Sequence, residues 1–168
     1  EVQLPYYDPI LYQGIKYKIG VTVENICPSS AGSFNVSLEL FWMEGIIIDY
    51  YGEMNVPGLA SGENVTLYFQ AHTNHVTAYV LTATADCNDD VAECNEQNNK
   101  TKMKIRSRMA GDIDGDDDID YMDLYKLAKA YGSTPDDRNW NEYADFNRDN
   151  KVDYMDLYML AKHYGQKT

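Results

Sequence analysis

Apolar and polar residues alternate with a period of two over most of the first two thirds of the chain. Such alternation is typical of β-strands with one buried face. Short runs of this kind cover residues 17–23, 34–40, 65–69, 76–85 and 103–105. The run at 76–85 is almost wholly apolar or Thr, as expected of a strand near the centre of a sheet. Turn-forming clusters separate the runs, and no helical pattern lies between them, so residues 1–108 are predicted to form an antiparallel β-sandwich.

The periodicity changes to a helical one after Arg108. Leu124, Leu127, Ala128 and Tyr131 follow the i, i+3, i+4, i+7 spacing of an amphipathic helix, and the same pattern recurs 33 residues later, at Leu157, Leu160, Ala161 and Tyr164. Gly132 and Gly165 stand where helix C-caps are expected. The predicted fold is therefore two domains, the all-β sandwich at 1–108 and a small all-α module at 109–168.

Residues 112–132 and 145–165 are an internal repeat, because 13 of their 21 aligned positions are identical. Each copy begins with a twelve-residue acidic loop followed directly by one of the predicted helices. Strand-like residues precede the first loop and leave no room for a helix there. The module is thus predicted to contain two loop–helix (F-hand) repeats, in contrast to the helix–loop–helix of an ordinary EF-hand.

The two acidic loops are predicted to bind two calcium ions. Calcium requires six to eight oxygen ligands, and a twelve-residue loop supplies them from side chains at positions 1, 3, 5, 9 and 12 and from a backbone carbonyl at position 7. In the first loop these positions are Asp112, Asp114, Asp116, Asp120 and Asp123, with Asp118 giving the carbonyl. In the second they are Asp145, Asn147, Asp149, Asp153 and Asp156, with Lys151 giving the carbonyl. A solvated acidic surface is disfavoured because both copies keep the same ligand spacing.

Two further loop positions carry structural expectations. Position 6 is normally Gly but is Asp117 and Asn150 here; Asp and Asn tolerate the left-handed backbone, so both loops should form. Ile119 and Val152 at position 8 are expected to pair the two loops with each other.

The charge balance restricts the partners. Lys plus Arg is 14 and Asp plus Glu is 27, a net charge of −13, which argues against nucleic acid and anionic membranes. No apolar run approaches the ~20 residues of a membrane-spanning helix. The first residues lack the pattern of a signal peptide, so a mature chain or an excised fragment is expected. No nucleophile–base pair or Gly-rich phosphate loop is present, so no enzymatic activity is expected.

Three cysteines and three glycosylation motifs suggest an extracellular or cell-surface protein. Cys87 and Cys94 bracket an acidic loop and could close a small disulfide ring, Cys27 could pair with either, and three free thiols are the alternative. The N-x-[ST] motifs start at Asn35, Asn64 and Asn99.

Three weaker candidate sites lie in the first domain. His72 and His75 are two ligands only, too few for a zinc site. Trp42 could belong to a sugar-binding platform but fits a sandwich core better. A further calcium ion could bind the acidic loop at 86–99 through Asp89, Asp90, Glu93 and Glu96, although a solvated loop fits this stretch better. Carbohydrate binding is therefore left without support.

The first domain resembles the cell-adhesion-related (CARDB-type) immunoglobulin-like domain over about residues 14–107. The residues that carry the resemblance are Val21-x-Val23-x-Asn25, Ala31-Gly32-x-Phe34, Val56-Pro57-Gly58-Leu59-x-x-Gly62-Glu63 and Glu93-x-x-Glu96-x-x-Asn99. The resemblance implies a seven-stranded sandwich from a surface protein.

The second domain resembles the dockerin family over about residues 110–167, with Trp140 and Tyr143 of the connector as expected core anchors. The resemblance implies calcium-dependent binding of a cohesin-domain protein by a chain that is monomeric alone. The family's contact positions correspond here to Tyr121, Met122, Ala128, Lys129, Tyr154, Met155, Ala161 and Lys162. Bacterial relatives usually carry Ser or Thr at the Tyr-Met positions, so the identity of the cohesin stays open. The alternative is a calcium-stabilised surface adhesion or carbohydrate-binding protein without a cohesin partner.

Overall fold

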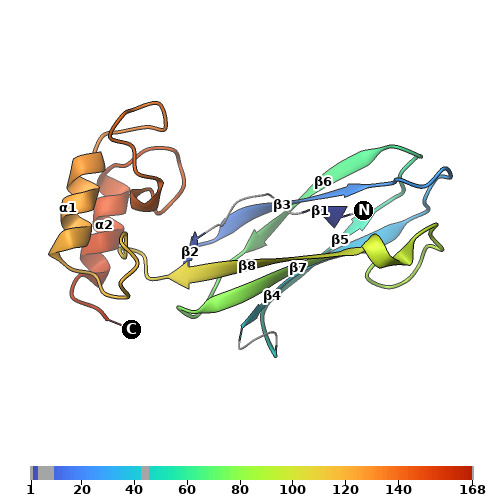
Figure 1. The fold of residues 1–168 in the computed structure, drawn as a ribbon, viewed down its shortest axis with the longest axis horizontal. Helices are drawn as coiled ribbons and strands as arrows, with labels where there is room; N and C mark the ends of the chain where they lie inside the picture. The colour runs from blue at the N-terminus through green and yellow to red at the C-terminus, as the bar shows by residue number, and fades with distance from the viewer. Residues whose placement is uncertain (1, 4–9, 43–45, 168) are drawn as a thin grey trace. The chain divides into compact units, whose positions relative to one another are not determined.

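The computed structural model describes residues 2–3, 10–42 and 46–167. The chain divides into two compact units, Glu1–Arg106 and Ser107–Thr168. The first contains the β-strands and the second contains both α-helices (Figure 1).

The first unit is a sandwich of two sheets. Its elements are β1 (Val2–Gln3), β2 (Ile10–Tyr12), β3 (Tyr17–Glu24), β4 (Phe34–Trp42), β5 (Ile47–Val56), β6 (Asn64–Ala71), β7 (Ala78–Ala85), the 3-10 helix η1 (Glu96–Asn98) and β8 (Lys100–Arg108). The strand orders are β1-β3-β6 and β2-β8-β7-β4-β5. The β1–β3, β3–β6, β4–β5, β4–β7 and β7–β8 pairings are antiparallel, which confirms the predicted sandwich.

Period-two alternation determines which side chains form the sandwich core. On β3 every odd residue from Tyr17 to Val23 is buried, and β4 buries Val36, Leu38 and Leu40 in the same way. β7 lies between β4 and β8, near the centre of its sheet as its apolar sequence predicts. Burial of these aliphatic side chains, each contributing about 1.5–3 kcal/mol, accounts for the packing of the two sheets.

The sequence pattern did not reveal β5. This strand lies at the edge of the five-stranded sheet, and its register with β4 shifts at Leu40/Phe41. Ile47, Ile48, Tyr51 and Met54 are exposed on it. An edge strand with an irregularity buries no continuous face, so strict alternation is not required of its sequence.

A disulfide joins Cys27, after β3, to Cys94, just before η1. Their Cα atoms are 5.8 Å apart, and Cys87 is a free, half-buried thiol. The disulfide is therefore present, but the small Cys87–Cys94 ring does not form. The fold brings together two loops 67 residues apart in the sequence, a proximity that the strand order creates and that local spacing does not reveal.

The second unit contains α1 (Tyr121–Ala130), the 3-10 helix η2 (Glu142–Ala144) and α2 (Tyr154–His163). Figure 1 shows α1 and α2 side by side, and the two helices are in contact. Leu127 and Leu160 are buried on them at equivalent positions, and Ile119, Phe146 and Val152 complete the core. The predicted helices and their loops are confirmed.

The predicted core is wrong at several residues. Tyr143 is 38% exposed and Trp140 is only half-buried, whereas the adjacent Phe146 is fully buried. Ala128 and Tyr131 are exposed, because α1 turns Asp123, Leu127 and Ala130 inward instead. Only one short face of α1 packs against this small core, and it is the face that carries the buried Asp123 carboxylate.

Ile119 and Val152 do not pair with each other through their backbones. Ile119 N–H donates to the Gln166 carbonyl (3.0 Å), and its own carbonyl accepts from Gly165 N–H (2.8 Å). Val152 makes the matching pair of bonds with Ser133 (3.0 Å) and Gly132 (2.8 Å). Both glycines have φ of +82°, a conformation that turns the chain back after each helix. Each loop is therefore held by the segment that follows the helix of the other repeat.

The Cys27–Cys94 bond should make a large contribution to the stability of the sandwich. Closing a loop of 67 residues lowers the entropy of the unfolded chain by an amount worth about 4 kcal/mol. We expect the double variant Cys27→Ser/Cys94→Ser to lose about that much free energy of unfolding in urea. Cys87→Ser is the matched control and should lose far less; equal losses in the two variants would contradict this role for the disulfide.

Candidate metal centre

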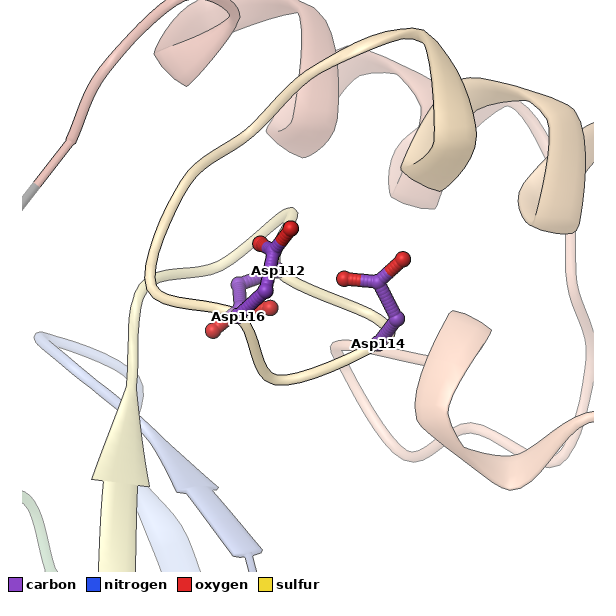
Figure 2. Close-up of side chains that lie close together, drawn as sticks. All are labelled: Asp112, Asp114 and Asp116. Atoms are coloured by element: carbon purple, nitrogen blue, oxygen red, sulfur yellow. The ribbon is translucent and has the colours of Figure 1, made fainter.

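Six aspartates of the first acidic loop form two close groups. One oxygen from each of Asp112, Asp114 and Asp116 lies within 4.8 Å of the others (Figure 2). The same holds for the second group, Asp118, Asp120 and Asp123. Like charges at such distances repel one another, and a divalent cation between them would offset the repulsion.

The carboxylate at position 12 is the most firmly held residue of each loop. Asp123 is fully buried, and its Oδ1 accepts from Ile113 N–H (2.8 Å) while its Oδ2 accepts from Asp120 N–H (2.9 Å). Asp156 repeats this arrangement with Phe146 (2.8 Å) and Asp153 (2.8 Å). Both residues lie at position N3 of their helices and complete capping boxes. The helix start and the loop are thus held by one side chain.

Three carboxylate oxygens of the first loop are buried without a hydrogen-bond partner among the described residues. They are Asp112 Oδ2, Asp114 Oδ1 and Asp118 Oδ1. Leaving a buried charged oxygen unpaired is costly, so these atoms fit a cation. The Asp118 side chain joins them, although only its backbone carbonyl was predicted to bind.

The second loop carries fewer charges, and among the described residues no three of its carboxylates form a close group. Asp145 is buried, and its oxygens accept from Asp149 N–H (3.2 Å) and Asn150 N–H (3.0 Å). Asn147 Oδ1 accepts from Asp149 N–H (3.0 Å), and Asn147 Nδ2 donates to Asp149 Oδ2 (2.9 Å). Lys151 Nζ lies 3.5 Å from Asp153 Oδ2. Asp145, Asn147 and Asp149 are thus linked within the loop, whereas Asp153 and Asp156 meet at the start of α2.

Position 6 adopts the backbone that its residues were expected to tolerate. Asp117 has φ of +69° and Asn150 has φ of +67°. Gly115, at position 4 of the first loop, also has a positive φ, of +80°. A Cβ there would lie 2.5 Å from the Arg108 guanidinium, which also lies over the Tyr143 ring. Arg108 was not predicted to contact the loop.

Burial shifts the acidity of the aspartates at positions 1 and 12. Loss of solvent raises the pKa of Asp112, Asp123, Asp145 and Asp156 above the ordinary value of 3.8, and neighbouring carboxylates raise these pKa values further. Asp114 behaves oppositely, because the hydrogen-bonded Lys126 ammonium lowers its pKa. Burial thus disfavours the charged form of these four carboxylates, and a bound cation would favour it.

Two lysines near the first loop were missed from the sequence. Lys126 Nζ lies 2.9 Å from Asp114 Oδ2, and Lys167 Nζ lies 2.7 Å from Asp118 Oδ2. Both stand where the other repeat has a different residue, Met159 in place of Lys126 and Thr134 in place of Lys167 at the 33-residue offset. Mismatches within the repeat are the signal that could have identified them.

The starts of both helices expose aromatic and Met side chains. Tyr121 is 63% exposed and Tyr154 is 65% exposed, and Met122 and Met155 are also exposed. Tyr121 stacks on Tyr125 and Tyr154 on Tyr158, with ring centroids 6.4 and 6.5 Å apart. The remaining predicted contact residues are all exposed as well: Ala128, Lys129, Ala161 and Lys162. Lys129 Nζ lies 5.1 Å from the centre of the Tyr125 ring.

The residues of the weaker candidate metal and sugar sites in the sandwich make contacts with other side chains or with the backbone. Trp42 stacks on His75 with centroids 4.3 Å apart, and His72 meets the edge of Tyr50. Asp89, Asp90, Glu93 and Glu96 form no close group of three among the described residues. Glu96 instead accepts a hydrogen bond from Glu93 N–H (2.7 Å).

Comparisons with known proteins agree with the two-part architecture. A family model described as CARDB matches residues 1–103, and one described as Dockerin type I domain matches residues 110–164. Comparison with the curated proteins finds no match. None of the helices in the described ranges is long and apolar enough to cross a membrane.

Several solved structures are similar to part of this chain. A Pyrococcus furiosus CARDB domain in complex with di-metal ions is 22% identical with a TM-score of 0.53, over 64% of this chain and 89% of that one. A domain of a Methanosarcina acetivorans protein is 25% identical with a TM-score of 0.48, over 58% and 82%. A Listeria innocua β-glucosidase in complex with glucose is 14% identical with a TM-score of 0.42, over 65% of this chain and 16% of the enzyme.

The raised pKa values predict opposite pH trends with and without calcium. A carboxyl group whose pKa is higher in the folded state stabilises that state when protonated, and this stability is lost as pH rises through the raised pKa. The calcium-stripped second unit should therefore unfold at a higher temperature at about pH 4.5 than at about pH 7. With calcium the order should reverse, because ligand carboxylates must be ionised. Thermal scans of helical circular dichroism test this, and one common trend in both conditions would contradict it.

Proposed function

We propose that this chain, which belongs to the CARDB family and carries a dockerin type I domain after the CARDB domain, is a calcium-dependent docking module that binds a cohesin-domain protein. Dockerin type I domains bind calcium, and both families are non-catalytic modules typical of exported or cell-surface proteins. On this proposal residues 109–168 dock the protein, and residues 1–108 act as a spacer or adhesion domain. The Cys27–Cys94 disulfide fits an oxidising, extracellular location.

The observation that carries the proposal is the pair of duplicated loops with buried carboxylates at both ends. In each copy the aspartates at positions 1 and 12 are buried, and the one at position 12 also caps the helix. A solvated acidic surface would leave these groups exposed. The unpartnered oxygens of Asp112, Asp114 and Asp118 add to the case for a cation.

Two calcium ions are proposed, one for each loop. The first would be held by Asp112, Asp114, Asp116, Asp118, Asp120 and Asp123, and the second by Asp145, Asn147, Asp149, Lys151, Asp153 and Asp156. Calcium supplies charge neutralisation and a fixed loop shape. The chain's own contribution is the set of N–H groups that aims Asp123 and Asp156 into their loops.

The proposed docking surface consists of the exposed residues at the starts and along the outer faces of α1 and α2. Its members are Tyr121, Met122, Ala128, Lys129, Tyr154, Met155, Ala161 and Lys162, all of them exposed. Aromatic and Met side chains are enriched in protein–protein interfaces. Tyr121 stacks on Tyr125 and Tyr154 on Tyr158, and such contacts between neighbouring rings would reduce the entropy lost on binding.

The duplication supports two docking orientations. Both repeats have a ten-residue helix with the same capping box, and each loop pairs with the segment after the other helix. This reciprocal pairing fits an approximate two-fold axis within the module. A cohesin with one complementary patch would then bind either repeat with similar energy.

The direct test is binding to a panel of cohesin domains with and without calcium. We expect at least one cohesin to be captured by the full chain in calcium and released in EGTA. The alternative function, a calcium-stabilised adhesion or carbohydrate-binding protein, predicts binding on a glycan array and none to any cohesin. Binding that survives EGTA would contradict the calcium requirement.

Asp123→Ala and Asp156→Ala should each remove one calcium ion, because each deletes the carboxylate at position 12. Calorimetric titration of the full chain should then fall from two ions to about one for either variant. Asp136→Ala, an exposed aspartate of the connector, is the matched control and should keep two. Two ions bound at unchanged affinity in either position-12 variant would show that the ligands are assigned to the wrong positions.

The two-orientation hypothesis predicts strongly non-additive variants. Replacing Tyr121 and Met122 with Ser, or Tyr154 and Met155 with Ser, should each cost at most a factor of two in cohesin affinity (~0.4 kcal/mol). The quadruple variant should lose far more than the sum. Tyr68→Ser, at a similarly exposed tyrosine of the sandwich, controls for general effects. If one double variant abolishes binding and the other is silent, docking uses a single face.

A further inference from the structure

The two acidic loops differ strongly in charge. Residues 112–123 contain seven aspartates and no basic residue, a net charge of −7. Residues 145–156 contain four aspartates, one arginine and one lysine, so four negative and two positive charges leave −2. Electrostatics alone would therefore make the first loop bind a divalent cation much more tightly than the second.

Lys126 brings a positive charge to the first loop. It lies on α1, three residues after Asp123, and its Nζ is 2.9 Å from Asp114 Oδ2. Both side chains are more than half buried, at 34% and 20% exposure, so solvent screens this pair less than a surface ion pair. The equivalent residue on α2 is Met159, which carries no charge.

The contact places Lys126 in competition with any cation in the loop. Asp114 is one of the three carboxylates that converge within 4.8 Å, together with Asp112 and Asp116. A cation that binds there must either displace the ammonium from Asp114 or share the carboxylate with it. Displacing the ammonium and sharing the carboxylate both cost free energy. The backbone of Lys126 cannot move away from the loop, because α1 is fixed by its capping box and by the buried Leu127.

We propose that Lys126 is an internal counter-ion that weakens calcium binding by the first loop and brings its affinity closer to that of the second. This inference rests on the proposed calcium function. Lys167 acts in the same direction, because its Nζ lies 2.7 Å from Asp118 Oδ2, but it is far more exposed and its contribution is smaller. With the two affinities matched, both repeats become ordered over one range of calcium concentration.

The experiment compares Lys126→Met with the native full chain. Methionine is the residue that the second repeat uses at this place, so helix propensity and side-chain length are preserved. Free calcium is set with a chelator buffer, and amide signals are followed by ¹⁵N–¹H NMR. Gly115 reports on the first loop, since its N–H donates to Asp112 Oδ1 (2.6 Å), and Asn150 reports on the second, since its N–H donates to Asp145 Oδ2 (3.0 Å).

We expect the calcium midpoint at Gly115 to fall at least about threefold in Lys126→Met, with a smaller change at Asn150. The reciprocal variant Met159→Lys should raise the midpoint at Asn150. Arg138→Gln removes one positive charge from the exposed connector and should move neither midpoint as far.

The outcomes separate the inference from the function on which it rests. An unchanged or raised midpoint at Gly115 in Lys126→Met would mean that the lysine is neutral or orients Asp114 for the ion, and the inference would be overturned while calcium binding stands. A shift in Arg138→Gln as large as in Lys126→Met would reduce the effect to net charge and overturn it too. A native chain without any calcium response at either reporter would overturn both.

Discussion

Confinement of like-charged carboxylates inside a small core is the constraint on which the second unit depends. Asp112, Asp123, Asp145 and Asp156 are buried together with Leu127, Leu160 and Phe146, in a module of about sixty residues. Such a core contributes only a few kcal/mol, and unpaired buried charges would consume that margin. Two of these carboxylates, Asp123 and Asp156, complete the capping boxes of α1 and α2, so charges that destabilise the core also help to determine where its helices begin. If the free cation concentration were 1,000 times its Kd, each bound cation would add about 4 kcal/mol to the free energy of unfolding.

The sandwich follows a different principle. Its two sheets bury alternating aliphatic residues on β3, β4 and β7, and a covalent bond joins its loops. Its largest fully buried side chains include two tyrosines, Tyr12 and Tyr79, and the Tyr79 hydroxyl donates to Asp49 (2.6 Å). No comparable convergence of carboxylates occurs in the part of the sandwich that the structure describes. The two units therefore differ in their cores, because the sandwich buries mainly apolar side chains and the second unit also buries carboxylates.

The sequence predicted those features that depend on local spacing. Alternation located β3, β4, β6, β7 and β8, and the ligand spacing of the repeat located both loops and both helices. Features that depend on contacts between distant segments were not predictable in this way. The irregular edge strand β5, the pairing of Cys27 with Cys94 and the pairing of Ile119 with the Gly165–Gln166 turn all arise from how separate elements meet. The lysines beside the first loop belong to the same class, since Lys126 and Asp114 meet only after α1 has folded back along its loop.

The disulfide also sets a limit on how far the sandwich can be stretched. Force applied to the chain on either side of residues 27–94 passes through the Cys27–Cys94 bond and bypasses the segment between them. The 67 residues of separation would otherwise add about 230 Å of contour length on mechanical unfolding, at about 3.5 Å per residue. Only the residues outside the closed loop are free to extend. A module anchored at one end and loaded at the other would thus yield by a short, fixed distance and keep β4, β5, β6 and β7 within the covalent ring.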